Sequence, residues 1–382
     1  MITYFVDDKL GGVTSLNYNL MANKGDSKTP QQVISIDLEE SEMTRSGIEF
    51  PVDKTTPFRF SIKDNYYTSI NRLSKLINRM EEGALVLNYD TEMAMLDHYP
   101  TKQTTYQLVH DDYNVGLAKK YGHLVDVFIC HNRDICAKLQ SVFPARTDRI
   151  FYRPHGVPIP ELIIEKRIKK EVVKLLFLGR MIESKGIFDL LEINNLLRHN
   201  QIKFEWTCIG NGPQLDSLKQ KWNPADKVNF ASPSTNREVI NLCKESDIFV
   251  LPTKFEGSPV SLLETMSVGL VPVITKLPGG ITEIVNSDIG FALSMDDNAA
   301  FAEAITKLAR DRSLLHQLSS NCIEKIRNEF DVKITAIGYH QLFERYREFY
   351  QEKEPKKIKV GARLDHPLIP SVLTKFVRTN FS

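Results

Sequence analysis

The sequence predicts an α/β protein of two domains, each with a parallel sheet covered by helices. The chain has 382 residues, which is enough for two or three domains of about 100–200 residues each. Short apolar runs alternate with segments of helical period, and repeated strand–helix units of this kind form parallel sheets. A Pro- and Gly-rich stretch over 154–160, followed by the charged run 165–171, is typical of a linker between domains.

Strand-like apolar runs recur in both halves of the chain. In the first half they lie at 2–6, 33–36, 84–87, 105–109 and 127–130, and a helix is expected over 67–80. In the second half they lie at 174–178, 204–209, 228–231, 247–251, 271–275 and 290–293, and helices are expected over 237–244 and 260–268. The polar stretch 38–64 has no pattern that assigns it. We expect a first domain over 1–157, completed by the tail 351–382, and a second domain over 158–350.

Charge and cysteine usage exclude several classes of protein. The chain has 49 Lys and Arg against 48 Asp and Glu, a net charge of +1. With no zinc-finger or RNP motif, nothing indicates a nucleic-acid partner. Five cysteines without a CxxC pair argue against a disulfide framework or structural zinc and fit a reducing compartment. The first apolar run meets Asp7 and Asp8 too early for a signal peptide, and no run approaches about 18 apolar residues. We expect a cytoplasmic protein.

The last part of the chain is basic. Residues 353–382 carry seven basic and two acidic side chains, a net charge of +5. Four apolar side chains of this segment could share one helical face: Val372, Leu373, Phe376 and Val377. Two interpretations remain open. The tail either packs back on the first domain or contacts an anionic membrane as a basic amphipathic helix.

Three strand-to-helix loops of the second domain carry candidate binding residues, because ligands of open parallel sheets bind at the carboxyl ends of the strands. In the first loop, Arg180 follows a strand and Lys185 stands near the start of the next helix. Helix N-termini attract anions, so the two cations are suited to a phosphate or diphosphate. Taken alone, an Arg and a Lys near a helix start are more often solvated surface residues.

The second loop is the turn Gly210-Asn211-Gly212-Pro213. Its glycines allow close approach of a ligand to the backbone, which makes Gly210, Asn211 and Gly212 candidates for a nucleotide pocket. The pattern is not GxGxxG, and no acidic residue ends a strand about 20 residues further on, so a dinucleotide site is weakly supported. A tight strand-to-helix turn is the alternative.

The third loop carries two carboxylates. Glu256 follows a fully apolar strand, and Glu264 lies among apolar residues of the next helix. A carboxylate in such surroundings needs hydrogen-bond donors, and sugar hydroxyls can supply them. Gly257 and Ser258 could add backbone N–H groups, although a capping carboxylate beside a solvated Glu would also fit. Together the three loops predict a nucleotide-sugar site, in which cations stabilise the diphosphate as its bond to the sugar breaks.

These loops resemble the donor domain of retaining glycosyltransferases of family 4, which have the GT-B fold. The matching stretches are FLGRMIESKG (177–186), CIGNGPQL (208–215), ESDIFVLPTKFEGSPVSLLETMSVGLVPVIT (245–275) and PGGITEIV (278–285). The resemblance covers about 150–350 and is looser in GGVTSLNYNL (11–20), at His110, and in 125–139 and 154–157. It implies two Rossmann-like domains that face each other across a cleft.

The resemblance also implies roles for single residues. The donor diphosphate would be bound by Arg180 and Lys185, with the Gly11-Gly12 turn closing over the phosphates. Glu256 would bind hydroxyls of the transferred sugar with help from the amides of Gly257 and Ser258, and Glu264 would bind the nucleotide ribose.

One histidine is a further catalytic candidate. His110 resembles the family's histidine near the transferred sugar, although a core histidine at a strand end is the alternative. Asp111 and Asp112 after it are interpreted as loop residues rather than as a metal-binding pair. His155 stands where the family more often has Asn.

The expected function is therefore transfer of a hexose from a nucleotide diphosphate sugar, with UDP-glucose as the favoured donor because UDP-sugars are common in the family. The expected acceptor is a saccharide or lipid-linked saccharide of polysaccharide or glycoconjugate biosynthesis. No cofactor and no metal are expected.

Four other functions are compared with this one by what each would require of the sequence. A glycoside hydrolase fits poorly, because eight helical residues place Glu256 and Glu264 about 12 Å apart, beyond the about 5–9.5 Å of hydrolase carboxylates. A phosphorylase-like enzyme would need a lysine-bound pyridoxal phosphate, for which no motif is seen. A sugar-nucleotide epimerase of the same architecture and a non-catalytic nucleotide-sugar-binding subunit remain as alternatives.

Overall fold

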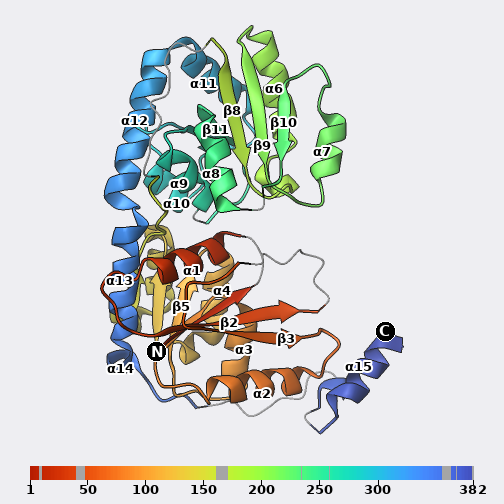
Figure 1. The fold of residues 1–382 in the computed structure, drawn as a ribbon, viewed down its shortest axis with the longest axis vertical. Helices are drawn as coiled ribbons and strands as arrows, with labels where there is room; N and C mark the ends of the chain where they lie inside the picture. Colours follow the sequence, from red (N-terminus) through yellow and green to blue (C-terminus); the bar gives the residue numbers. More distant parts are fainter. Residues whose placement is uncertain are drawn as a thin grey trace. The chain divides into compact units, whose positions relative to one another are not determined.

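The computed structural model describes residues 1–7, 11–39, 48–160, 171–233, 235–257, 259–354, 363–366 and 368–380. These residues divide into two compact units (Figure 1). The first comprises Met1–His131, Ile135–Pro154 and Lys333–Ser382, and the second comprises Asn132–Asp134 and His155–Val332.

The first unit is built on a parallel sheet of seven strands in the order β3-β2-β1-β4-β5-β6-β7. The strands are β1 (Ile2–Asp7), β2 (Gln31–Leu38), β3 (Lys54–Phe60), β4 (Ala84–Leu87), β5 (Thr104–Val109), β6 (Val127–Cys130) and β7 (Ile150–Tyr152). The order reverses between β1 and β4. In a doubly wound sheet this switch point is where a crevice for ligands opens.

Helices pack on both faces of this sheet. They are α1 (Gly12–Ala22), α2 (Tyr66–Ile77), α3 (Asp90–His98), α4 (Asp112–Tyr121), α5 (Arg133–Val142), α13 (Val332–Glu344) and α14 (Tyr346–Phe349). Apolar side chains of α2 and α3 form one buried cluster with the sheet, and those of α4 and α5 form another. Both clusters lie on one face of the sheet, because Leu87 of the first is in register with Gln107, and Gln107 with Phe128 of the second. On the opposite face, Phe343 of α13 packs against Tyr4 and Tyr106, so both faces are covered.

The second unit has a parallel sheet of six strands in the order β10-β9-β8-β11-β12-β13. The strands are β8 (Val173–Leu178), β9 (Phe204–Ile209), β10 (Val228–Ala231), β11 (Ile248–Leu251), β12 (Val271–Thr275) and β13 (Phe291–Leu293). The helices are α6 (Asp189–His199), α7 (Leu215–Lys221), α8 (Asn236–Lys244), α9 (Val260–Ser267), α10 (Gly280–Ile284), α11 (Asn298–Arg310) and α12 (Arg312–Glu329). Here the strand order reverses between β8 and β11, so the loops that follow these two strands are neighbours.

The predicted fold class, two Rossmann-like parallel-sheet units, is confirmed, and each expected strand is present within two residues of its predicted ends. Two strands were not predicted. β3 lies in the unassigned stretch 38–64, at the sheet edge, and contains Pro57, which fits only an edge strand. β7 has only three residues at the opposite edge. Both therefore lack the continuous apolar run, four or more residues long, that marks a central strand of a parallel sheet.

The boundary between the units differs from the prediction. The chain returns to the first unit at Lys333 rather than at 351, and the second unit's long segment begins at His155 rather than at 158. The reason is the burial of α13, whose Phe343 ring lies 6.0 Å from that of Tyr4 and 5.2 Å from that of Tyr106. The helical period of α13 does not reveal which sheet it covers.

The tail is attached to the first unit by polar contacts. The Lys353 ammonium lies 2.6 Å from the Asp126 carboxylate, and both side chains are buried. The Asn65 amide donates to the carbonyl oxygens of Leu364, His366 and Ile369. The predicted helical segment is α15 (Ser371–Asn380). The basic run at 356–359 lies outside the described residues.

Candidate nucleotide-sugar site

The loops after β8 and β11 interlock at the switch point of the second unit. The backbone N–H of Lys254 donates to the carbonyl oxygen of Ser184 over 2.8 Å, and the Thr253 hydroxyl donates to the same oxygen over 3.2 Å. Gly186 has a φ of +71°, and a Cβ there would lie 1.9 Å from the carbonyl oxygen of Pro252. Only glycine fits this position, and the close packing fixes each loop against the other.

This packing brings together two predicted site residues. Lys185 ends the short 3-10 turn Glu183–Lys185, and its ammonium forms an ion pair with the Glu256 carboxylate. The two side chains are 22% and 11% exposed. Burial raises the pKa of Glu256, and the Lys185 ammonium opposes that shift. The loops thus hold a cation and a carboxylate side by side, partly shielded from water.

A second ion pair stands on the same loop. The ammonium of Lys254 lies 3.0 Å from Asp296 and 3.9 Å from Asp189, and these contacts raise its pKa. Lys254 is exposed, and its charge is balanced by residues other than Glu256. It was not predicted as a site residue.

The glycine turn after β9 packs against the loop after β8. Gly210 has a φ of +145°, and a Cβ there would lie 1.9 Å from the carbonyl oxygen of Gly179; at Gly212 it would lie 2.5 Å from that of Met181. The Met181 N–H donates to the carbonyl oxygen of Asn211 over 2.9 Å. The described geometry therefore requires these glycines for loop packing, and their nucleotide role stays a prediction. Arg180, in the loop after β8, is exposed.

Glu264 lies on α9 with its side chain half-buried. Burial raises its pKa to about 7, and a hydrogen bond from the Asn236 side chain, at the start of α8, works in the opposite direction. A group with this pKa is partly protonated near neutral pH. Gly257 is half-buried at the end of the Glu256 loop, and Ser258 lies outside the described residues.

In the first unit, the predicted glycine turn begins helix α1. Gly11 is the N-cap residue and Gly12 the first helical residue, and both are exposed. A Cβ on Gly11 would meet nothing within 4 Å. The backbone at Gly11 is extended, with φ at 174°, so the fold itself does not demand glycine at this position.

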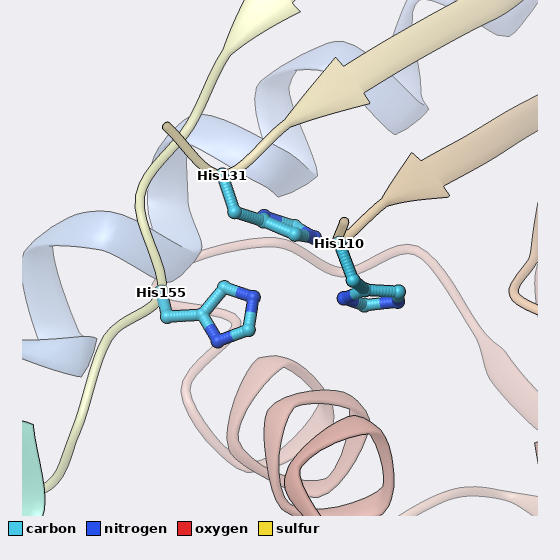
Figure 2. A group of neighbouring side chains, drawn as sticks. All are labelled: His110, His131 and His155. Carbon is cyan, nitrogen blue, oxygen red and sulfur yellow. The ribbon is translucent and has the colours of Figure 1, made fainter. Parts of the chain in front are cut away.

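His110 follows β5, and His131 follows the neighbouring strand β6. Figure 2 shows the two rings close together, with centroids 4.7 Å apart and planes inclined by 33°. Burial, with the nearby His131, lowers the pKa of His110 well below its ordinary value, and burial lowers the pKa of His131 to about 4. Both imidazoles are therefore neutral at physiological pH. His155, also labelled in Figure 2, is buried and belongs to the second unit.

The residues around His110 show how its position is set. The Asp111 carboxylate caps α4 by accepting from the N–H of Asn114 over 3.0 Å, and Asp112 pairs with Lys138 at 2.6 Å. These contacts give both aspartates local partners. The His110 Nε2 atom lies 3.2 Å from the Asn88 side-chain oxygen.

Three polar residues that contact or support candidate site residues were not predicted: Asn88 beside His110, Glu92 beside Asn88, and Asn236 beside Glu264. The first directly follows the apolar strand 84–87, so its position at a strand end was a usable signal. The other two lie at the starts of helices, where polar residues are common as caps, and sequence alone does not separate a cap from a site residue.

Comparison with known proteins places these loops in a family context. Residues 159–328 match the family model "Glycosyl transferases group 1". This segment is similar to that family. It contains each of the three candidate loops of the second unit, including Arg180, Lys185, Glu256 and Glu264.

Two curated relatives extend this similarity. The chain is 26% identical over 248 residues to the Escherichia coli UDP-Gal:alpha-D-GlcNAc-diphosphoundecaprenol alpha-1,3-galactosyltransferase, covering 61% of this chain and 62% of the relative. It is 26% identical over 189 residues to the capsular polysaccharide biosynthesis glycosyltransferase CapM of Staphylococcus aureus, covering 47% of each. The chain thus spans less than two thirds of the length of either relative.

Among solved structures, HepE of Anabaena in complex with UDP and glucose has a TM-score of 0.70 at 13% identity, with 90% of this chain and 99% of HepE covered. At this identity the likeness concerns the fold alone. It agrees with the GT-B fold that the sequence predicts.

Proposed function

We propose that this protein is a retaining glycosyltransferase of family 4 that transfers a hexose from a UDP-sugar, UDP-glucose being the first candidate, to a saccharide or lipid-linked saccharide. The observation that carries the proposal is the Lys185–Glu256 pair at the switch point of the second unit. A cation suited to a diphosphate stands there beside a carboxylate suited to sugar hydroxyls. The similarity of residues 159–328 to glycosyl transferases group 1 supports it.

In the proposed reaction, the bond between the anomeric carbon and the diphosphate oxygen breaks, and a bond to the acceptor oxygen forms on the same face of the sugar. The leaving phosphate takes the acceptor's proton. Arg180 and Lys185 stabilise the charge that builds on the diphosphate, which is the largest electrostatic demand of the step. We propose that these side chains make a metal unnecessary, so EDTA should leave the rate unchanged.

Glu256 would hold the transferred sugar through its hydroxyl groups, and Glu264 would hold the ribose. The test is transfer from radiolabelled UDP-glucose to a panel of free and polyprenyl-diphosphate-linked saccharides. Glu256→Ala should nearly abolish transfer while the circular dichroism spectrum stays that of the wild type. Transfer within a few-fold of the wild-type rate would remove the role assigned to Glu256.

The same panel separates the alternatives. A sugar-nucleotide epimerase would convert UDP-glucose without an acceptor, and a binding subunit would bind the nucleotide without turnover in either the wild type or Glu256→Ala. The anomeric configuration of the product, read by NMR, tests retention. Reaction with polyprenyl-linked saccharides would place the protein in polysaccharide or glycoconjugate biosynthesis at the cytoplasmic membrane face.

A lipid-linked acceptor is supported by the orientation of α15. The Ser371 hydroxyl accepts from the backbone N–H of Asn65 over 3.1 Å, and Arg378 donates to the carbonyl oxygen of Asp64 over 2.7 Å, so the polar side of the helix is docked on the first unit. Thr374, on the same side, is buried. The apolar side faces outward, with Val372 81%, Leu373 51% and Phe376 58% exposed. Among the described residues, no helix is long and apolar enough to span a membrane. We propose that α15 instead rests on an anionic bilayer surface.

Vesicle cosedimentation tests this contact. The wild type should sediment with phosphatidylglycerol vesicles, and a variant with Val372, Leu373 and Phe376 changed to Ser should stay in solution. Changing the buried Thr374 to Ser is the matched control. Equal sedimentation of the triple variant and the wild type would exclude α15 as the contact.

A further inference from the structure

We propose that Asn88 is a positioning residue for the transfer reaction: its side chain fixes the tautomer and the ring orientation of His110. The inference rests on the proposed function through the role of His110 beside the transferred sugar. Asn88 stands directly after β4, at the switch point between β1 and β4, and His110 stands after the next strand, β5.

The orientation of the Asn88 amide follows from its contacts. Its nitrogen Nδ2 donates to the carbonyl oxygen of Phe5 in β1 over 2.9 Å. A carbonyl oxygen accepts only, so the nitrogen of the amide must point to Phe5. The amide oxygen Oδ1 is thereby turned toward His110, where it lies 3.2 Å from Nε2.

This orientation sets the proton on His110. An amide oxygen has no hydrogen to donate, so the hydrogen bond forms only when Nε2 carries the proton. The neutral ring then presents Nδ1 as its acceptor nitrogen. A histidine that acts on a substrate depends on such a partner, because the hydrogen bond at one ring nitrogen decides the state of the other.

Asn88 is itself held by buried groups. Its backbone N–H donates to the Glu92 carboxylate over 2.8 Å, and the N–H of Tyr89 donates to the same oxygen over 2.7 Å. Asn88 is 3% exposed and Glu92 is fully buried. Glu92 of α3 therefore fixes the backbone at Asn88 through these two hydrogen bonds, and this limits rotation of the Asn88 amide away from His110.

The neighbouring residues allow a matched control. The backbone N–H of His110 donates to the Asn114 side-chain oxygen over 3.2 Å. Asn114 is buried like Asn88, but it holds main chain rather than the ring: besides the His110 N–H, its side chain contacts the backbone carbonyl oxygen of Asn88 over 3.5 Å. Loss of Asn114 should disturb the local fold while leaving the partner of Nε2 in place.

The experiment combines NMR with kinetics on the full chain. Selective 15N-histidine labelling, with His110→Gln to assign the signals, reports which nitrogen of His110 carries the proton. In the wild type and in Asn114→Ala the proton should sit on Nε2, and in Asn88→Ala it should divide between both nitrogens. Asn88→Asp loses the donor to the Phe5 carbonyl oxygen but keeps an acceptor toward Nε2, so its His110 proton should stay on Nε2. The result therefore does not depend on Asn88→Ala alone.

Kinetics then separate this inference from the function on which it rests. In Asn88→Ala, kcat should fall by about 10–100-fold, the size of loss seen when a metal-bound histidine loses its outer partner, while KM for UDP-glucose stays within a few-fold. An unchanged tautomer in Asn88→Ala overturns the inference. A changed tautomer with unchanged kcat overturns the role of His110 in transfer. Absence of transfer in the wild type with every acceptor overturns the proposed function, while the NMR result still decides whether Asn88 sets the tautomer.

Discussion

Glu256→Gln should strengthen the binding of UDP while it abolishes transfer. In the structure the Lys185 ammonium is engaged by the Glu256 carboxylate, and the proposed diphosphate site uses the same ammonium. A neutral Gln releases Lys185 to the diphosphate and also removes a negative charge from beside an anionic ligand. Both effects act in the same direction.

The magnitude follows from the burial of the pair. With 22% and 11% of the two side chains exposed, the pair lies between surface pairs, which contribute about 0–1 kcal/mol, and buried pairs, whose disruption costs about 3–5 kcal/mol. A value of about 1 kcal/mol corresponds to roughly a fivefold change in the dissociation constant of UDP. UDP-glucose should gain less, because Gln offers weaker acceptors to the sugar hydroxyls than a carboxylate does.

Calorimetric titration of the wild type and Glu256→Gln with UDP and with UDP-glucose measures both quantities. Asp296→Asn is the matched control, because it weakens the Lys254 pair on the same loop without touching Lys185. It should leave the affinity for UDP unchanged. Weaker binding of UDP by Glu256→Gln than by the wild type would refute the shared use of Lys185.

Four further predictions follow from single sites. Arg180→Ala should weaken UDP binding more than uridine binding, and equal losses in calorimetry would contradict a diphosphate contact. The pKa of Glu264 is about 7, and ribose hydroxyls favour the ionised carboxylate. UDP binding should therefore release protons near pH 7 and weaken as pH falls, and titration in buffers of different ionisation enthalpy should show no release in Glu264→Gln. Burial raises the pKa of Glu92 from 4.5 to about 7, so the folded state holds a proton that the unfolded state loses, and stability falls as pH rises across this range. Each pKa unit corresponds to about 1.4 kcal/mol, so Glu92→Gln should reduce this decrease in the free energy of unfolding by about 3 kcal/mol, as measured by denaturant titrations at several pH values. A pH dependence of stability equal to that of the wild type would disprove the assignment to Glu92. Gly11→Ala should melt at the wild-type temperature, because a Cβ at this position meets nothing within 4 Å. The variant should nevertheless lose transfer activity if the Gly11-Gly12 turn closes over the phosphates, and transfer at the wild-type rate would exclude that closure.

The second unit was the more predictable from sequence because its strands are short, apolar and each closed by a turn. Arg180, Lys185 and Glu256 lie in the loops that follow two such strands, and parallel topology places strand-end loops at one edge of the sheet. The ion pair between Lys185 and Glu256 was not predicted, since it depends on the order of β8 and β11 in the sheet and on the close fit at Gly186.

The first unit was less predictable because its polar residues act through tertiary contacts. The role of Asn88 depends on its contacts with Phe5 in β1 and with His110, which follows β5. The return of α13 to the first sheet likewise depends on the aromatic contacts of Phe343. No local pattern encodes such pairings.

The central claim is a diphosphate-binding donor site in the second unit, and nucleotide titration tests it most directly. The protein would be titrated by calorimetry with UDP, GDP and ADP in the presence of EDTA, and then with magnesium. The account predicts that UDP binds without metal and that Lys185→Ala weakens this binding. Failure of all three nucleotides to bind, or an affinity for UDP unchanged in Lys185→Ala, would contradict it.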